Sequence, residues 1–178
     1  ALTTGCSIDL AKSLSLGEVQ PKQFKETVRI EVHNGLIFLP VTIQGEAFNF
    51  LFDSGAPFSI SKKLQNEFGF KIITKGNIVD SDHNRKSVSW AQVDAIRVGE
   101  VDFLEQTAFI GDFDQNPLLK CLNIDGIVGS NFMRHCIWTI DQKEMKLVLS
   151  NAIDQQIIEE STQIPFTTDF QYNIFLDI

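Results

Sequence analysis

Two glycine-containing turns divide the early part of the chain into short strands. Asn34-Gly35 and Gln44-Gly45 are typical of tight turns that reverse the chain between antiparallel strands. Before the first turn, apolar and polar residues alternate over residues 28–32, which predicts one half-buried strand. Further strands are expected over residues 36–43 and 47–52. Three strands joined by two short turns predict a β-meander at the start of the fold.

The rest of the chain is also expected to be mostly strand. Strand pieces are predicted at Ile72-Ile73 and Ile78-Val79, interrupted by Lys75-Gly76-Asn77. One hairpin is expected over residues 88–110 with its turn at Gly99, and another over residues 137–149. Residues 112–117 read as a loop. The pattern predicts an all-β domain with one or two short helices.

The clearest helix signal follows Ser61. This serine can cap a helix, Leu64 and Phe68 lie four residues apart on one face, and Gly69 can end the helix. A second helical turn is expected from Asn131. A short helix over residues 8–14 is the alternative to an extended N-terminal tether.

Length and charge restrict the class of protein. The chain has 178 residues, is 43% hydrophobic and contains fifteen Phe, enough for one well-packed domain. Its formal net charge of −8 disfavours nucleic acid as a partner. No apolar run is long enough for a membrane span.

The three cysteines do not form a recognisable metal or disulfide framework. None belongs to a C-x-x-C pair, so no thiolate zinc site is predicted. Cys121 and Cys136 are expected to be small buried side chains, with a disulfide between them as the alternative. Leu2-Thr3-Thr4-Gly5 before Cys6 resembles the end of a bacterial lipoprotein signal, so Cys6 is either a lipid anchor or a free thiol near the terminus.

The candidate for chemistry is an apolar strand that ends in Asp53-Ser54-Gly55-Ala56. A carboxylate at the end of a buried strand is costly unless hydrogen bonds or a partner charge stabilise it. The alternative is an ordinary turn, because Asp, Ser and Gly all favour turns. Two later features bear on the choice: a polar hairpin tip over residues 80–86, and Gly126-Ile127-Val128-Gly129.

In this order, these features resemble one lobe of the retropepsin-like and pepsin-like aspartic proteases, and the sequence looks closest to bacterial, often envelope-located members. The resemblance covers residues 24–150 and implies a closed barrel lobe over residues 23–152, with an N-terminal tether over 1–22 and an extension over 153–178. It implies that Asp53 is the catalytic carboxylate and that Ser54 and Gly55 hold its turn. The segment Ile127-Val128-Gly129 would pack against the site, and a flap would lie near residues 79–88. The substrate-binding residues that follow from this placement are Ala56, Asp80, Ser81 and Asp82.

The implied chemistry needs two aspartates and no metal or cofactor. A pair of close carboxylates shares one proton, so that one acts as general base on water and the other as general acid. The chain has one Asp-Ser-Gly, and Asp125 is interpreted as a turn or loop residue. The second aspartate would come from an identical partner chain or from a second lobe. A weak similarity of Ile174-Phe175-Leu176 to Ile37-Phe38-Leu39 favours the second lobe.

Two departures from the family pattern are Pro57, where a small polar or acidic residue is usual, and a flap without tyrosine, since the one tyrosine is Tyr172. A serine–histidine mechanism is disfavoured because no Gly-x-Ser-x-Gly motif is present. The other alternative is a catalytically inactive module that binds extended peptides by strand addition or mediates dimerisation. The expected location is the bacterial cell envelope, where a lipid on Cys6 would anchor the protein. The alternative is that the protein is secreted.

Overall fold

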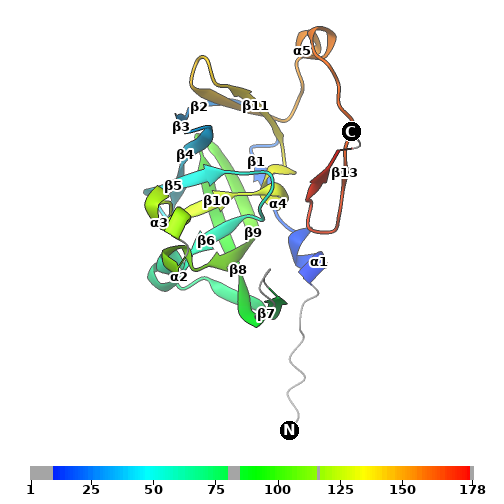
Figure 1. Cartoon of the computed structure of the whole chain (residues 1–178). Helices are drawn as coiled ribbons and strands as arrows, with labels where there is room; N and C mark the ends of the chain where they lie inside the picture. The colour runs from blue at the N-terminus through cyan, green and yellow to red at the C-terminus, as the bar shows by residue number, and fades with distance from the viewer. Residues whose placement is uncertain (1–9, 80–84, 116, 177–178) are drawn as a thin grey trace.

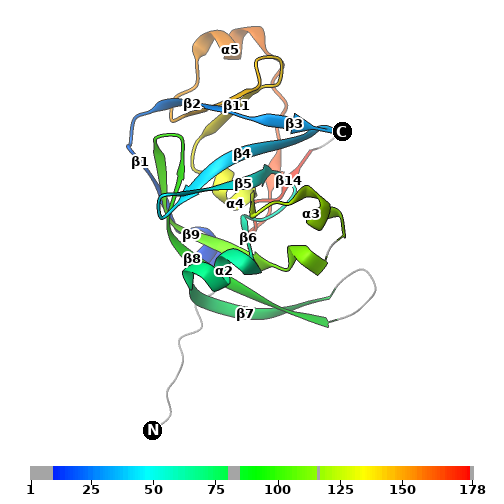
Figure 2. The same ribbon diagram turned by 90° about the vertical axis from the view of Figure 1, so that its left-hand side faces the viewer.

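The structure is a computed structural model that describes residues 10–79, 85–115 and 117–176. Its largest part is a nine-stranded sheet in which hydrogen-bonded neighbours follow the order β1-β9-β6-β10-β5-β4-β8-β7, with β3 paired to β4. Strand β8 pairs with β9 from Trp90 to Val98 and also pairs with β4, where Arg97 lies opposite Thr42. The sheet therefore curls round until β8 joins its two sides, as Figures 1 and 2 show.

The strands of this sheet lie between residues 18 and 128. They are β1 (Glu18–Gln20), β3 (Glu31–His33), β4 (Leu36–Ile43), β5 (Glu46–Phe52), β6 (Ser59–Ser61), β7 (Lys71–Val79), β8 (Arg85–Val98), β9 (Val101–Gly111) and β10 (Gly126–Val128). A three-stranded sheet packs beside it, made of β2 (Lys25–Arg29), β11 (Ile137–Asp141) and β12 (Lys146–Ser150). A separate hairpin near the C-terminus pairs β13 (Thr167–Thr168) with β14 (Ile174–Phe175).

The helices are short. They are α1 (Leu10–Leu14), α2 (Lys62–Phe68), the 3₁₀ helix η1 (Phe113–Gln115), α3 (Pro117–Leu122), α4 (Ser130–Met133) and α5 (Gln155–Glu160). The all-β class is confirmed, but helices are more numerous than the one or two expected. None of the described helices is long and apolar enough to span a membrane.

The turn signals of the sequence hold in the structure. Asn34 and Gly35 have φ values of 54° and 80°, and Gln44 and Gly45 have 51° and 90°, as tight hairpin turns require. Helix α2 begins with the Ser61 side chain accepting a hydrogen bond from the Leu64 N–H at 3.1 Å, and it ends at Gly69 with φ 64°. These local predictions succeed because each depends on the backbone preferences of a few adjacent residues.

Predictions made without distant contacts were wrong in four places. The single strand expected over residues 28–32 divides at Ile30, because β2 pairs with β12 while β3 pairs with β4. Strand β7 runs without interruption through Lys75 and Gly76, since its partner β8 continues opposite them. The loop expected over residues 112–117 contains η1 and the start of α3, and Cys121 on α3 is exposed rather than buried.

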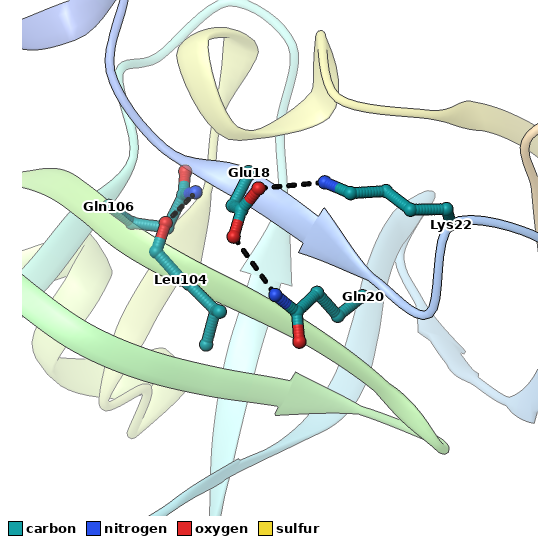
Figure 3. Close-up of polar contacts among 5 residues, drawn as sticks. All are labelled: Glu18, Gln20, Lys22, Leu104 and Gln106. Carbon is teal, nitrogen blue, oxygen red and sulfur yellow. Dashed lines mark hydrogen bonds and ion pairs between the residues drawn. The ribbon is translucent and has the colours of Figure 1, made fainter.

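The N-terminal residues that are described lie against the lobe. Strand β1 pairs with β9, and Leu14 of α1 is buried. Figure 3 shows the contacts beside this pairing: the Glu18 carboxylate accepts hydrogen bonds from Gln20 at 2.9 Å and from Lys22 at 2.7 Å. The buried Gln106 side chain donates to the Leu104 carbonyl at 2.8 Å. Part of the range expected as a tether therefore belongs to the folded unit.

A cluster of stacked aromatic rings joins the elements around β10. Phe103 stacks on Phe132 with ring centroids 4.1 Å apart, and Phe132 lies 5.0 Å from Phe58. All three side chains are fully buried. Each such pair adds about 0.5–1.5 kcal/mol beyond the burial of its area. The cluster fixes α4 and the segment before β6 against β9.

His135, which follows α4, is a polar group within this apolar region. Its ring lies 6.4 Å from the Phe103 ring, and its buried Nε2 atom has no hydrogen-bond partner. Desolvation, together with the nearby charge of Arg134, lowers the pKa of His135 to about 4. The folded state therefore favours the neutral imidazole.

We predict that His135→Phe reduces the dependence of stability on acid pH. Because the folded pKa lies below the unfolded value of about 6.5, the unfolded state binds a proton first, and stability is lost as the pH falls from about 6.5 to 4. Urea unfolding at pH 7 and pH 4.5 measures the difference for wild type and variant. The control is the same substitution at the exposed His33, and equal pH dependence in both variants would contradict the prediction.

Candidate active site

Asp53 follows directly after β5, the central strand of the site. Strand β5 pairs with β4 on one side and runs parallel to β10 on the other, with Leu51 opposite Ile127 and Phe52 opposite Val128. The Asp53 N–H donates to the Val128 carbonyl at 3.0 Å, which extends this pairing by one residue. Asp53 thus lies at the end of a strand in which Phe50 and Leu51 are buried, as the sequence predicted.

The turn after β5 orients this carboxylate with its own backbone. The Gly55 N–H donates to Asp53 Oδ1 at 2.8 Å, and the Ala56 N–H donates to the Asp53 carbonyl at 3.3 Å. Asp53 is half-buried, whereas Ser54 and Gly55 are exposed. One carboxylate oxygen is therefore fixed from within the lobe, while the turn itself faces outward.

The second glycine of the Gly-Ile-Val-Gly segment lies against this turn. The Ser130 N–H donates to the Ala56 carbonyl at 2.9 Å. A Cβ atom on Gly129 would overlap backbone atoms of Ala56, Pro57 and Phe58. The close approach of two backbones that the sequence predicted here is confirmed, and it occurs directly below the Asp53 turn.

A groove opens beside the turn. It has a volume of about 940 Å³, and Ala56, Pro57 and Ile127 line it on the side of the turn. Val88 and Trp90 from β8 and Phe109 from β9 form another side, with the Trp90 and Phe109 rings edge to face at 5.5 Å. The remaining lining residues are Ser59, Lys62, Ile110, Gly111, Asp112, Phe113, Gln115, Pro117, Leu119 and Gln171. Most of the lining is apolar, and the Lys62–Asp112 ion pair, at 2.6 Å, is its main charged feature.

The structure brings some of the predicted site residues together. Asp53, Ser54, Gly55 and Ala56 form one turn, and Ala56 lines the groove. Strands β7 and β8 pair up to Val79 and Arg85, so a hairpin is present where the flap was expected, and it projects from the lobe in Figure 2. Asp80, Ser81 and Asp82 lie outside the described residues, and their role stays a prediction.

Other groove residues were missed from the sequence. Trp90 and Phe109 come from two strands of one hairpin, and Gln171 comes from the C-terminal extension. In the sequence, Trp90 and Phe109 stand out only as apolar side chains on strands, and Gln171 only as a polar residue in a turn. Many other residues of the chain fit these descriptions. Only the three-dimensional arrangement shows that they face one groove.

Asp125 lies at the other end of β10 and has a structural role. Its Oδ2 atom accepts a hydrogen bond from the Asn49 N–H at 3.1 Å, its own N–H donates to the Asn49 carbonyl at 2.8 Å, and Lys63 Nζ lies 3.8 Å from Oδ1. Asn49 precedes Asp53 by most of the length of β5. The interpretation of Asp125 as a loop residue is confirmed, and it is not the second carboxylate of this site.

Cys121 and Cys136 are free, and burial raises the pKa of the Cys136 thiol to about 12, which disfavours the reactive thiolate. The described residues contain no group of three or more metal-ligating side chains.

The lobe thus carries one aspartate on a turn beside an apolar groove, with a hairpin projecting from its β-sheet. A family model described as "Aspartyl protease" matches residues 39–132 of the 178, a span that contains Asp53 and Gly129. The chain belongs to the aspartyl protease family. Among solved structures, it is similar to a retropepsin-like aspartic protease from Rickettsia conorii, with 16% identity, a TM-score of 0.49, and coverage of 75% of this chain and 93% of that chain. No curated protein matches.

We predict that Gly129→Ala disrupts the Asp53 turn. The glycine has φ −110°, which alanine adopts readily, so the effect is purely steric. Overpacking against fixed backbone should lower the free energy of unfolding by about 1–3 kcal/mol and displace residues 56–58. Urea denaturation and peptide cleavage by the folded protein measure the two effects.

The control for this variant is Gly45→Asn. Gly45 has φ 90° and open space around its Cβ position, and asparagine tolerates that conformation better than most residues. This control should retain activity. A Gly129→Ala protein with wild-type activity would show that the close approach is unimportant for the site.

Proposed function

We propose that Asp53 is one of the two catalytic carboxylates of an aspartic peptidase and that this chain supplies one lobe of its active site. The observation that supports the role of Asp53 most directly is the turn itself. Its carboxylate is half-buried, one oxygen accepts the Gly55 N–H at 2.8 Å, and Ala56 and Pro57 of the same segment line the groove. This arrangement fixes a carboxylate three residues before Ala56, which lines a groove large enough for an extended peptide.

The chemistry follows from pairing Asp53 with a second aspartate. Two adjacent carboxylates share one proton, and the pair titrates as a unit. The ionised carboxylate removes a proton from a water that attacks the peptide carbonyl, while the protonated one donates to the carbonyl oxygen. Ser54 and Gly55 are exposed on the turn, which leaves them accessible to a second half of the site.

The groove indicates the substrate. Its apolar walls around Trp90, Phe109 and Ile127 suit the side chains of a peptide in extended conformation. Lys62 and Asp112 add a charged position on the groove lining. We infer that the substrate is a peptide or an unfolded protein segment with apolar side chains near the cleaved bond.

The second aspartate comes from a second lobe or from a second copy of this chain. The C-terminal hairpin supports an assembly on this side of the lobe. The Ser130 hydroxyl donates to the Gln171 carbonyl at 3.2 Å, and the Arg134 guanidinium lies 5.0 Å from the centre of the Tyr172 ring. The hairpin and its flanks expose apolar side chains, namely Ile164, Phe166, Phe170, Ile174, Phe175 and Leu176. We favour a second lobe, because residues 174–176 resemble residues 37–39 of β4.

We predict that Asp53→Asn in the full-length protein removes peptide cleavage. The amide is nearly isosteric but cannot act as general base, so kcat should fall roughly 100-fold or more. Cleavage of a fluorogenic peptide with apolar residues, measured across acid pH, tests this. Unchanged cleavage would overturn the role of Asp53 and would favour the alternative of a binding module.

Mixing the same variant with wild type distinguishes the two sources of the second aspartate. If two copies form the site, mixed pairs are inactive, and activity falls with the square of the wild-type fraction. If one polypeptide carries both lobes, activity falls in direct proportion to that fraction. Asp125→Asn is the matched control, because Asp125 lies at the opposite end of β10.

We propose that the protein is attached to the bacterial cell envelope through a lipid on Cys6. The proposal rests on the sequence around Cys6, which lies outside the described residues. Fatty-acid labelling in a bacterial host should mark the wild type and fail to mark Cys6→Ser, with Cys121→Ser as the control. A label that persists in Cys6→Ser would contradict the anchor.

A further inference from the structure

Asn131 is a buried polar side chain that connects two backbone segments. It is 1% exposed. Its Oδ1 atom accepts a hydrogen bond from the Phe58 N–H at 2.7 Å, and its Nδ2 atom donates to the Thr107 carbonyl at 3.0 Å. Phe58 and Thr107 are buried too, so without the amide both backbone groups would lose their partners away from water.

The contact to Phe58 completes a ladder beneath the catalytic turn. Asp53 N–H donates to Val128, and Ser130 N–H donates to the carbonyl of Ala56. The next group along the turn, the Phe58 N–H, needs an acceptor on the same side. The Gly129 and Ser130 carbonyls are engaged within α4, where they accept from Phe132, Met133 and Arg134. The Phe58 N–H therefore donates to the side-chain carbonyl of Asn131, because the nearby backbone carbonyls already accept other hydrogen bonds.

The contact to Thr107 ties the same amide to the wall of the groove. Thr107 lies on β9 two residues before Phe109, which lines the groove and whose N–H donates to the Phe58 carbonyl at 2.8 Å. One side chain thus holds the segment after Asp53 and the strand that carries the groove wall at a fixed separation. Both contacts have ordinary distances, and the amide uses both of its ends.

We propose that Asn131 is a positioning residue for peptide hydrolysis, which sets the place of the Asp53 turn relative to the groove by bridging Phe58 and Thr107. The proposal rests on the proposed function, because it concerns the same site. The side-chain hydrogen bonds of Asn131 go to Phe58 and Thr107, neither of which lines the groove, so it acts through the backbone of residues 53–58. Its removal should affect kcat more than KM, because most of the groove lining lies outside residues 53–58.

The isosteric variant Asn131→Asp provides a specific test. The new carboxyl can still accept from Phe58, but it can donate to the Thr107 carbonyl only when protonated. We expect kcat relative to wild type to fall at least tenfold near neutral pH and to recover toward wild type on acidification, while KM changes less than about twofold. A role in core packing alone would lower stability without a pH-dependent ratio of kcat values.

Asn151→Asp is the matched control. Asn151 makes the same two-sided bridge, accepting from the Phe24 N–H at 3.2 Å and donating to the Lys22 carbonyl, but it is exposed and lies outside the groove. The ratio of the kcat of the Asn151→Asp variant to the kcat of the wild type should stay constant with pH. If the Asn131→Asp protein does not fold at neutral pH, Asn131→Ser, which cannot span both contacts and adds no charge, should reduce kcat at all pH values.

Amide hydrogen exchange tests the proposal without catalytic activity. Protection of the Phe58 N–H in Asn131→Asp should fall at least tenfold near neutral pH and return on acidification, when expressed relative to the intrinsic exchange rate. Unchanged protection together with an unchanged kcat ratio would overturn the positioning role. A wild type without cleavage would contradict the proposed function, and the exchange result would still decide whether Asn131 positions the turn.

Discussion

The parallel pairing of β5 with β10 is the contact on which the site depends. It brings residues 50–53 and 126–128, far apart in the sequence, into adjacent strands. The pairing continues beyond the strands, through Asp53 N–H to Val128 and Ser130 N–H to Ala56. Two backbone segments can approach so closely only where side chains are absent. Gly129 meets this condition against the backbone of residues 56–58. The position of Asp53 is therefore determined by backbone contacts, which tolerate less displacement than surface side chains do.

The aromatic core supports the pairing of β5 with β10. Phe58 follows the Asp53 turn, Phe132 belongs to α4, and Phe103 lies on β9, so their contacts join these three segments. Polar and apolar interactions have different roles here. Burial of the rings supplies much of the stabilisation, whereas the amide of Asn131 and the backbone ladder specify the register of the turn. A core of similar volume without Asn131 could remain folded and still place Asp53 differently.

The sequence predicts those features that neighbouring residues determine. The turns at Asn34-Gly35 and Gln44-Gly45, the caps of α2 at Ser61 and Gly69, and the strand that leads to Asp53 all follow from local preferences. Ile30 shows where such reasoning fails. The alternation of residues around Ile30 indicates one strand. Its two halves nevertheless belong to different sheets, because β2 pairs with β12 and β3 pairs with β4. Trp90, Asn131 and Gln171 were missed for the same reason, because their roles depend on segments distant in sequence.

The half-buried state of Asp53 fits a lobe whose site is shared. A carboxylate that is fully desolvated in an isolated lobe would be costly unless its charge were compensated. Here one oxygen accepts the Gly55 N–H, while the turn remains exposed at Ser54 and Gly55, so the charge keeps access to water. Assembly with the second half would remove this water and at the same time supply the second carboxylate that shares its proton. Desolvation and pairing would then occur in one step, so the site would acquire its acid–base properties only when it is complete. The hairpin β13–β14 is hydrogen-bonded through Gln171 to Ser130, directly after the Gly129 contact, and it and its flanks expose apolar side chains beside this segment.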